Sequence, residues 1–242
     1  MRARLTQAIS QGAPLYNAGS HDGCAQLYAA TALDLLTEGA FSDLSSLELN
    51  DALSADHATP SDRAWALRRA FDRALGDAAF APRIEAPLPA GVPGPGPVGA
   101  VVEKAYPATR AARCRGAGAF GALFRHISGA GISMTSPVLA ALSEGAQPAR
   151  LYMAFFYGAP ARGAPGPAGG GVEVVDLPPL RVLSVCVRGV AEGPALSLAQ
   201  RCVETGLAAR GLARSGPWRL LSYNSPMVPA ELCTFELQAP LA

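Results

Sequence analysis

Chemically reactive groups are scarce in this sequence of 242 residues. It holds three histidines and one lysine, Lys104, and only 16% of its residues are charged, with a formal net charge of +1. A nucleic-acid binder needs a basic surface, so this balance excludes a dedicated role of that kind. Hydrophobic residues make up 50% of the chain, but no apolar run approaches the roughly 18 residues of a transmembrane helix. We therefore expect a globular chain with a sizeable core and no membrane span.

Cysteines are few and widely spaced. The five of them, Cys24, Cys114, Cys186, Cys202 and Cys233, form no C-x-x-C pair. An odd number at such spacing indicates neither a disulfide framework nor a zinc site, so we expect free, buried thiols in a reducing compartment. The first residues enter a helical pattern without an apolar signal segment. The expected location is soluble and intracellular, in the cytoplasm or, after removal of a transit peptide, in a plastid such as the chloroplast.

Catalytic motifs are absent as well. The sequence has no Gly-x-Ser-x-Gly nucleophile turn, no Gly-rich phosphate loop with a lysine and no His-Glu-x-x-His pair. His21 and His57 stand beside Asp22 and Asp56, and these pairs indicate solvated loop residues rather than acid–base partners. Hydrolytic and phosphoryl-transfer chemistry is unsupported, and we expect a protein that is not an enzyme.

What the sequence has in surplus is glycine and proline, 26 and 21 residues, many of them in two tracts. The first, residues 86–97, has no face to bury and predicts an interdomain linker. The second, residues 158–171, lies between two strand-like runs and predicts a long surface loop. The predicted organisation is a helical domain at residues 1–85, the linker, and a second domain at residues 98–242.

The helical domain is predicted from apolar spacing and capping signals. Apolar residues from Cys24 to Leu35 recur at helical intervals, and Thr59 with Asp62 forms a capping box. The predicted helices span about residues 3–11 and 22–37 and start again at Thr59. Turn residues at 12–19 predict a turn, so we expect a small bundle of three helices.

In the second domain the hydrophobic period changes to that of strands. The predicted strands span residues 98–104, 108–114, 132–139, 150–157, 172–175, 181–188, 218–223 and 231–237. Helical stripes occur at residues 120–127 and 199–207. The order strand–strand–helix–strand–strand thus occurs twice, which predicts an α+β domain with internal pseudo-twofold symmetry.

Apolar and aromatic residues beside arginine mark the candidate binding site. Phe120, Leu123, Phe124 and Ile127 share one helix stripe, which is either core against the sheet or the wall of a groove. Such a groove would hold a flat, apolar ligand with acidic tails, and arginine would pair with the tails. His126, on the helix shoulder, is the candidate axial ligand of an iron. The predicted ligand-binding residues are Phe120, Leu123, Phe124, Arg125, His126, Ile127, Met134, Tyr223 and Met227.

Five segments of the second domain resemble the SOUL haem-binding family. They are VEKAYPA at 102–108, FGALFRHISG at 120–129, ISMTSPV at 132–138, YNSP at 223–226 and ELC at 231–233. The resemblance covers about residues 98–241 and implies a distorted eight-stranded β-barrel with two helices, built from two repeats. It also implies a soluble carrier or buffer that binds haem or a related tetrapyrrole non-covalently in an apolar cleft.

Two alternatives to a tetrapyrrole carrier stay open. Residues 12–19 and 24–28, with 64–68, resemble a helical extension that precedes SOUL domains in algal and bacterial proteins, and this part could dock a protein partner or cap the barrel. An enzyme acting on a small apolar ligand in the same cleft would need Glu103 or His126 to face that cleft.

Overall fold

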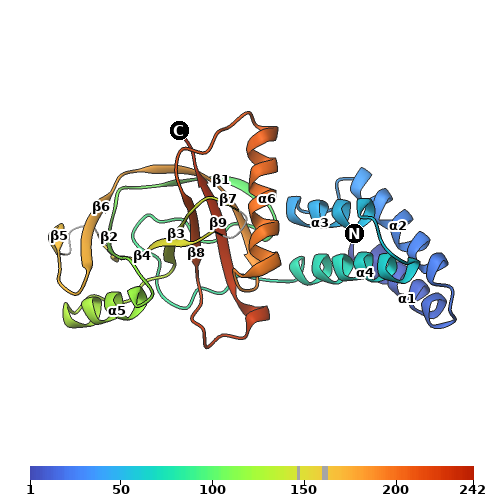
Figure 1. The fold of residues 1–242 in the computed structure, drawn as a ribbon, viewed down its shortest axis with the longest axis horizontal. Helices are drawn as coiled ribbons and strands as arrows, with labels where there is room; N and C mark the ends of the chain where they lie inside the picture. The colour runs from blue at the N-terminus through green and yellow to red at the C-terminus, as the bar shows by residue number, and fades with distance from the viewer. Residues whose placement is uncertain (146–147, 160–162) are drawn as a thin grey trace. The chain divides into compact units, whose positions relative to one another are not determined.

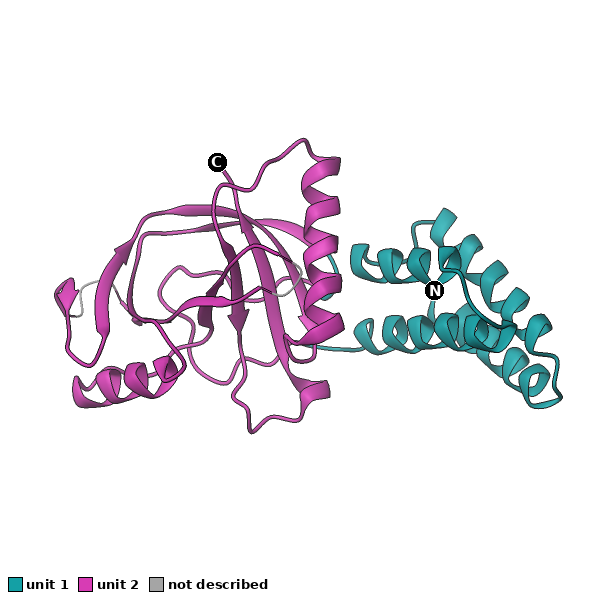
Figure 2. Cartoon of the chain, viewed as in Figure 1, with its two compact units in different colours: residues 1–81, 98–100 teal, residues 82–97, 101–242 magenta. Residues whose placement is uncertain are grey.

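The computed structural model describes residues 1–145, 148–159 and 163–242, which form two compact units (Figure 2). The first unit comprises Met1–Ala81 and Val98–Ala100, and the second comprises Pro82–Pro97 and Val101–Ala242. An all-α part is thus followed by an α+β part, as the sequence predicts. Among the described residues, no helix combines the length and the apolar character needed to cross a bilayer.

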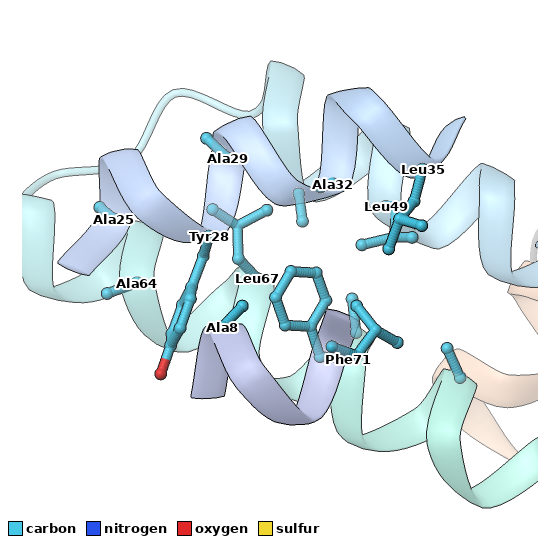
Figure 3. Close-up of a cluster of buried hydrophobic side chains, with 14 of the residues drawn as sticks. Ala8, Ala25, Tyr28, Ala29, Ala32, Leu35, Leu49, Ala64, Leu67 and Phe71 are labelled. Atoms are coloured by element: carbon cyan, nitrogen blue, oxygen red, sulfur yellow. The ribbon is translucent and has the colours of Figure 1, made fainter. Parts of the chain in front are cut away.

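Four helices build the first unit around one apolar core. They are α1 (Arg2–Asn17), α2 (His21–Thr37), α3 (Asp43–Ser54) and α4 (Pro60–Asp77). Tyr28, Leu67 and Phe71 pack together in this core (Figure 3). The predicted start of α4 is confirmed, because Thr59 Oγ1 accepts a hydrogen bond of 3.1 Å from the Asp62 N–H and Pro60 occupies the first turn.

Helix α3 has no counterpart in the sequence prediction. Its start is marked by Ser42, whose side chain accepts from the Ser45 N–H, and it buries Leu44 and Leu49. Serine, aspartate and asparagine fill many of its other positions, and these residues favour caps and turns over helix interiors. The short apolar stripe is therefore hidden in a stretch with turn-like composition.

The turn predicted at residues 12–19 is confirmed only at Ala18 and Gly19, because α1 continues through Gly12 and Pro14 to Asn17. Gly12 serves close packing instead of a turn. A Cβ at this position would overlap the ring of Tyr28, so the absent side chain lets α1 and α2 approach each other. Burial of the Tyr28 ring offsets the roughly 1 kcal/mol that a glycine costs inside a helix.

The second unit contains nine strands and two α-helices among its described residues (Figure 1). They are β1 (Val101–Tyr106), β2 (Thr109–Cys114), α5 (Ala119–Gly129), β3 (Val138–Leu142), β4 (Arg150–Phe156), β5 (Gly166–Pro167), β6 (Val172–Leu177), β7 (Leu180–Arg188), α6 (Gly193–Ala209), β8 (Trp218–Ser222) and β9 (Thr234–Pro240). Every predicted strand has a counterpart, and the two-residue β5 is the addition to the predicted eight. A single turn of 3-10 helix, Ala230–Leu232, precedes β9.

The sheet order confirms the predicted pseudo-twofold repeat. All pairings are antiparallel, and the order is β1-β7-β9-β8-β3-β4-β2-β6-β5. Exchanging β1 with β6, β2 with β7, β3 with β8 and β4 with β9 reverses the order of those eight strands and otherwise leaves it unchanged. The pseudo-twofold axis therefore passes between β3 and β8.

Both helices cover the same face of this sheet. Residues opposite each other on neighbouring strands point to the same side, so the row Phe155, Val138, Ser222 and Phe235 defines one face. Helix α5 packs on β2, β4 and β6, and helix α6 packs on β1, β7 and β9. In the sheet order, β8 and β3 lie between these two sets of strands.

The opposite face is covered by residues 82–97, which we call the strap. Val92 of the strap is buried in a core with Tyr106, Leu139, Phe156 and Leu221. The sequence predicts most of this segment to be a linker, whereas in the structure it belongs to the second unit. Its glycine and proline residues bury little side-chain surface, but their backbone groups bond to polar side chains of the sheet.

Candidate ligand-binding groove

A groove of about 920 Å³ opens on the helix-covered face of the second unit. Its floor comes from the central strands, with Val138 on β3, Met153 on β4, and Leu220 and Ser222 on β8. Cross-strand pairing links these residues: Val138 is opposite Ser222, and Ala140 is opposite both Met153 and Leu220. The floor therefore coincides with the pseudo-twofold axis, between the strands that carry α5 and those that carry α6.

The walls of the groove come from the first turn of α5, two loops and the strap. Phe120 of α5 packs edge-on against Phe155, with ring centroids 5.2 Å apart, and remains 46% exposed. The loop after β8 contributes Met227, which is 89% exposed. Residues 189–192, between β7 and α6, and Glu85 with Ala86 of the strap also line the groove. A solvent-exposed methionine beside an exposed phenylalanine is typical of an adaptable apolar binding surface.

Charges in the groove lining are few and unevenly placed. Arg150 lies at one end, where it is opposite Leu142 of β3. Glu192 follows the end of β7, and Glu85 is bonded to Ser225 just after β8. The floor strand Val138–Leu142 of five residues separates the two ends by about 13 Å. Among the described residues, neither the Arg150 guanidinium nor the Glu192 carboxylate has a hydrogen-bond or ion-pair partner.

Cys233 lies at the acidic end and lines the groove. Burial first, and then the carboxylates of Glu85 and Glu231, raise the pKa of its thiol. The thiol therefore stays protonated near neutral pH and is a poor nucleophile. All five cysteines are free and buried, as the sequence predicts.

The structure divides the predicted site residues into two groups. Phe120, Met134, Tyr223 and Met227 line the groove. Leu123 and Ile127 are buried in the core between α5 and the sheet. Phe124 is 51% exposed and stacks on Phe120 at 6.3 Å between ring centroids. Neither Phe124 nor the exposed Arg125 is among the described residues that line the groove.

His126 is held by a neighbour in the sheet. Its Nε2 lies 2.7 Å from the hydroxyl of Tyr157, and the two rings are nearly parallel. Burial raises the pKa of the Tyr157 phenol, which Arg110 partly offsets. His126 too is absent from the described lining of the groove, and no cluster of potential metal ligands occurs in the part of the chain that the structure describes.

The other carboxylate considered from the sequence, Glu103, lies on the surface. It pairs with Arg181 on the neighbouring strand β7 at 2.9 Å. Neither Glu103 nor His126 is therefore among the described residues that face the cleft, as catalysis there would need.

The sequence did not predict a buried polar cluster on the strap-covered face of the sheet. Glu236 of β9 is completely buried and accepts hydrogen bonds from the Tyr223 hydroxyl at 2.9 Å and the Gly96 N–H at 2.7 Å. Lys104 forms an ion pair with the same carboxylate and also donates to the Gly94 carbonyl at 2.7 Å. Gln238 extends the cluster by donating to Tyr106 at 2.7 Å.

The signal for this cluster is present in the sequence. Phe235 and Leu237 alternate with Glu236 and Gln238 along β9, which places the two polar residues on the face opposite the helices. An amphipathic strand ordinarily exposes its polar face to water. Here the strap encloses that face, which the alternation alone does not reveal.

The helical unit has a smaller concavity of about 70 Å³, lined by aromatic residues that include Tyr16, Tyr28 and Trp65. Trp65 is 48% exposed, and its indole N–H donates to the Tyr16 hydroxyl at 2.9 Å. This volume is well below the roughly 300 Å³ at which drug-sized ligands are usually bound. The groove of the second unit is therefore the better candidate for a small-molecule site.

No protein-family model matches this sequence, and no curated protein matches it. Several solved structures resemble about three fifths of the chain. The C-terminal domain of EcmrR has a TM-score of 0.46 at 13% identity, covering 59% of this chain and 96% of that domain. A hydrolase from Listeria innocua has a TM-score of 0.47 at 12% identity, covering 62% and 94%. A protein solved in complex with tetraphenylphosphonium has a TM-score of 0.35 at 9% identity, covering 59% and 93%. At these identities the likeness concerns the fold alone.

Proposed function

We propose that the second unit is a binding module that holds a bulky, apolar small molecule non-covalently in the groove. The observation that carries this proposal is the groove itself, with a volume of about 920 Å³ and a floor of Val138, Met153 and Leu220. Pockets for small molecules commonly reach this size and combine apolar walls with a few polar groups. Phe120 and Met227 supply apolar surface that stays exposed until a ligand covers it.

A tetrapyrrole is the first ligand class to consider, because the sequence resembles the SOUL family. The apolar floor suits the face of a macrocycle, and Phe120 could pack on its edge. Arg150 could pair with one of the acidic side chains of haem. His126 does not fit the role of iron ligand in this arrangement, since its Nε2 is bonded to Tyr157. We therefore propose that a tetrapyrrole would be held by apolar contact and Arg150, without ligation by His126.

A lipophilic cation is the second candidate ligand, and a specific observation favours it. Of the three charged residues that line the groove in the described part of the chain, two, Glu85 and Glu192, are acidic and lie at the same end. The Glu192 carboxylate, which has no partner among the described residues, could attract a cationic group that the apolar floor holds in place.

Titration of the full-length protein with hemin and with tetraphenylphosphonium tests the proposal. Hemin binding is followed by its Soret absorbance and tetraphenylphosphonium binding by calorimetry. Saturable binding of either probe at micromolar concentration, weakened by Leu220→Arg in the floor, would support the proposal. A correctly folded protein that binds neither probe would contradict it.

The charge variants then separate the two ligand classes. Arg150→Ala should weaken hemin binding and leave tetraphenylphosphonium binding unchanged, whereas Glu192→Gln should do the opposite. His126→Ala should leave the Soret position of bound hemin unchanged. A shifted Soret band in that variant would show that His126 ligates the iron after all.

A further inference from the structure

The helical unit has a small concavity of its own, where the end of α1 meets the first halves of α2 and α4. Its lining comes from positions 13–17, 24–28 and 64–68, which fall within the sequence segments that resemble the helical extension. The concavity has a volume of about 70 Å³, roughly the share of two water molecules in the liquid. It therefore has room for one small functional group, with the rest of a ligand outside it.

An aromatic wall borders this concavity and is held in place by its own hydrogen bonds. The Trp65 indole N–H donates to the Tyr16 hydroxyl at 2.9 Å, and that hydroxyl lies 2.6 Å from Ser61 Oγ. The Tyr16 ring packs edge-on to Trp65, with 5.7 Å between the ring centroids. Trp65 nevertheless remains 48% exposed. A fixed indole with this exposure offers apolar surface to a ligand and loses little side-chain entropy on binding.

The other polar groups of the lining include two buried hydrogen-bond donors. Cys24 and Tyr28 are almost completely buried, and the thiol and the phenol are in hydrogen-bonding contact. Burial, the largest effect, raises the pKa of the Tyr28 phenol, so this hydroxyl stays protonated near neutral pH and can donate. Asn17 adds a side-chain amide that has no hydrogen-bond partner among the described residues, and its NH₂ group is a further donor.

Arg68 supplies the positive charge of the lining. Its Nε donates to the two carboxylate oxygens of Asp72 at 3.0 and 3.1 Å, so this pair does not use the two Nη groups. Arg68 also contacts Tyr28, because its hydrogen bond and its charge lower the pKa of that phenol against the larger effect of burial. A guanidinium with unused Nη groups beside a hydroxyl donor matches the two oxygens of a carboxylate.

We propose that this concavity is a second binding site, which takes the carboxylate of a small molecule or of a chain end. Arg68 and the Tyr28 hydroxyl bind the carboxylate, and the apolar part next to it lies against the exposed surface of Trp65. A cation would instead meet the Arg68 charge at contact distance, so the aromatic wall does not act as a cage for ammonium groups. This site does not depend on the groove of the second unit.

Nuclear magnetic resonance of the full-length protein tests this proposal. The chain has two tryptophans, and Trp218 is buried, so the indole N–H signal of Trp65, assigned with Trp65→Phe, reports on the concavity. Sodium benzoate at millimolar concentration should shift this signal saturably. Neutral benzamide and the cation benzyltrimethylammonium should leave it in place. An equal response to either of these two probes, or no response to benzoate, would overturn the proposal.

Two variants and a control connect this response to the proposed donors. Arg68→Gln should weaken benzoate binding roughly tenfold, and Tyr28→Phe, which removes only the hydroxyl, about threefold. Arg69→Gln is the matched control, because Arg69 is exposed and is not among the described residues of the lining. It removes the same charge and should leave the affinity unchanged. Full affinity in Arg68→Gln, or the same loss in Arg69→Gln, would overturn the proposal.

The peptide Gly-Gly-Phe, with a free or an amidated C-terminus, distinguishes the two sources of the carboxylate. If the free peptide binds more tightly than benzoate, the occupant is the end of a protein chain. If benzoate binds more tightly, the occupant is a small molecule. In both cases the binding should be lost in Arg68→Gln. An amidated peptide that binds as well as the free one would overturn the role of the carboxylate.

Discussion

At the residue scale, the ion pair of Lys104 and Glu236 is the most consequential contact of the second unit. It is formed by the only lysine of the chain and a carboxylate with no solvent exposure. A buried carboxylate is tolerated only when its oxygens are paired or hydrogen-bonded. Here the Lys104 ammonium, the Tyr223 hydroxyl and the Gly96 N–H meet that requirement. The pair therefore joins β1 and β9 to the strap.

Removing one partner of this pair should be costly. Lys104→Met leaves the Glu236 charge buried and unpaired, which we expect to lower the free energy of unfolding by about 3–5 kcal/mol. The double variant Lys104→Met with Glu236→Gln removes the charge as well, so it should be more stable than Lys104→Met alone. Urea unfolding curves of the three proteins measure the difference. Equal stability of the single and double variants would show that the buried charge is not what makes Lys104 necessary.

The two tyrosines of this cluster predict how stability depends on pH. Burial first, and then the Glu236 carboxylate, raise the pKa of Tyr106 and of Tyr223 above the ordinary value near 10. Above about pH 10 the unfolded chain loses these protons while the folded chain keeps them, so stability is fully present below that pH and falls as the pH rises. Each phenol should contribute a loss of about 1.4 kcal/mol per pH unit.

Unfolding free energies measured between pH 8 and 11, together with near-ultraviolet phenolate absorbance, check this expectation. Tyr223→Phe should flatten the alkaline decline. Phenolate signals from all six tyrosines in the folded protein near pH 10 would contradict the assignment.

At the scale of elements, a helix or strand was predicted correctly where its own residues carry the signal, and incorrectly where a contact with another element decides. Helix α4 follows from a capping box and a regular apolar stripe, both readable from residues 59–75. Helix α1 does not, because the reason for Gly12 is the ring of Tyr28 on another helix. Strand β3 begins later than predicted because Pro137 has no N–H for a ladder. The preceding Ser136 N–H bonds to the strap instead.

The role of Gly12 gives a prediction for the α1–α2 contact. Gly12→Ala places a methyl group within the space of the Tyr28 ring, so it should destabilise the protein by about 1–3 kcal/mol, the usual cost of overpacking. Gly129→Ala, at the end of α5, meets no atom within 4 Å and should be neutral or slightly stabilising. Thermal unfolding of both variants measures the contrast. A Gly12→Ala variant as stable as the wild-type protein, or more stable, would contradict the proposed close contact between α1 and the Tyr28 ring.

At the scale of the whole molecule, the two-repeat order of the second unit was predictable because each repeat carries its own strand and helix periods. The candidate groove was predictable in part. Phe120, Met134, Tyr223 and Met227 are in its lining, but Glu85 and Glu192 are not adjacent to them in sequence. Their place depends on the path of the strap and on the loop before α6, and no local pattern specifies either.

Charge is also distributed unevenly over the molecule. The first unit has ten acidic and six basic residues, and the second has nine acidic and fourteen basic residues. The net charge of +1 therefore conceals an acidic helical unit and a basic α+β unit. A positive second unit suits an anionic amphiphile at long range, while the acidic groove end favours a cation at short range. Preferred binding of hemin would show that the net charge of the second unit decides the ligand class. Preferred binding of tetraphenylphosphonium would show that the acidic end of the groove does.

The central claim is that the groove, and not the outer surface of α5, binds the ligand. Phe120 and Phe124 provide a matched pair, because both lie on α5, both are about half exposed and they stack on each other. Only Phe120 is among the described residues that line the groove. The direct test is the dissociation constant of the tighter of hemin and tetraphenylphosphonium for Phe120→Ala and Phe124→Ala. We expect a loss of affinity of roughly tenfold for Phe120→Ala, equal to about 1.4 kcal/mol, and a change of less than about twofold for Phe124→Ala. Equal losses in both variants, or a larger loss in Phe124→Ala, would contradict the account.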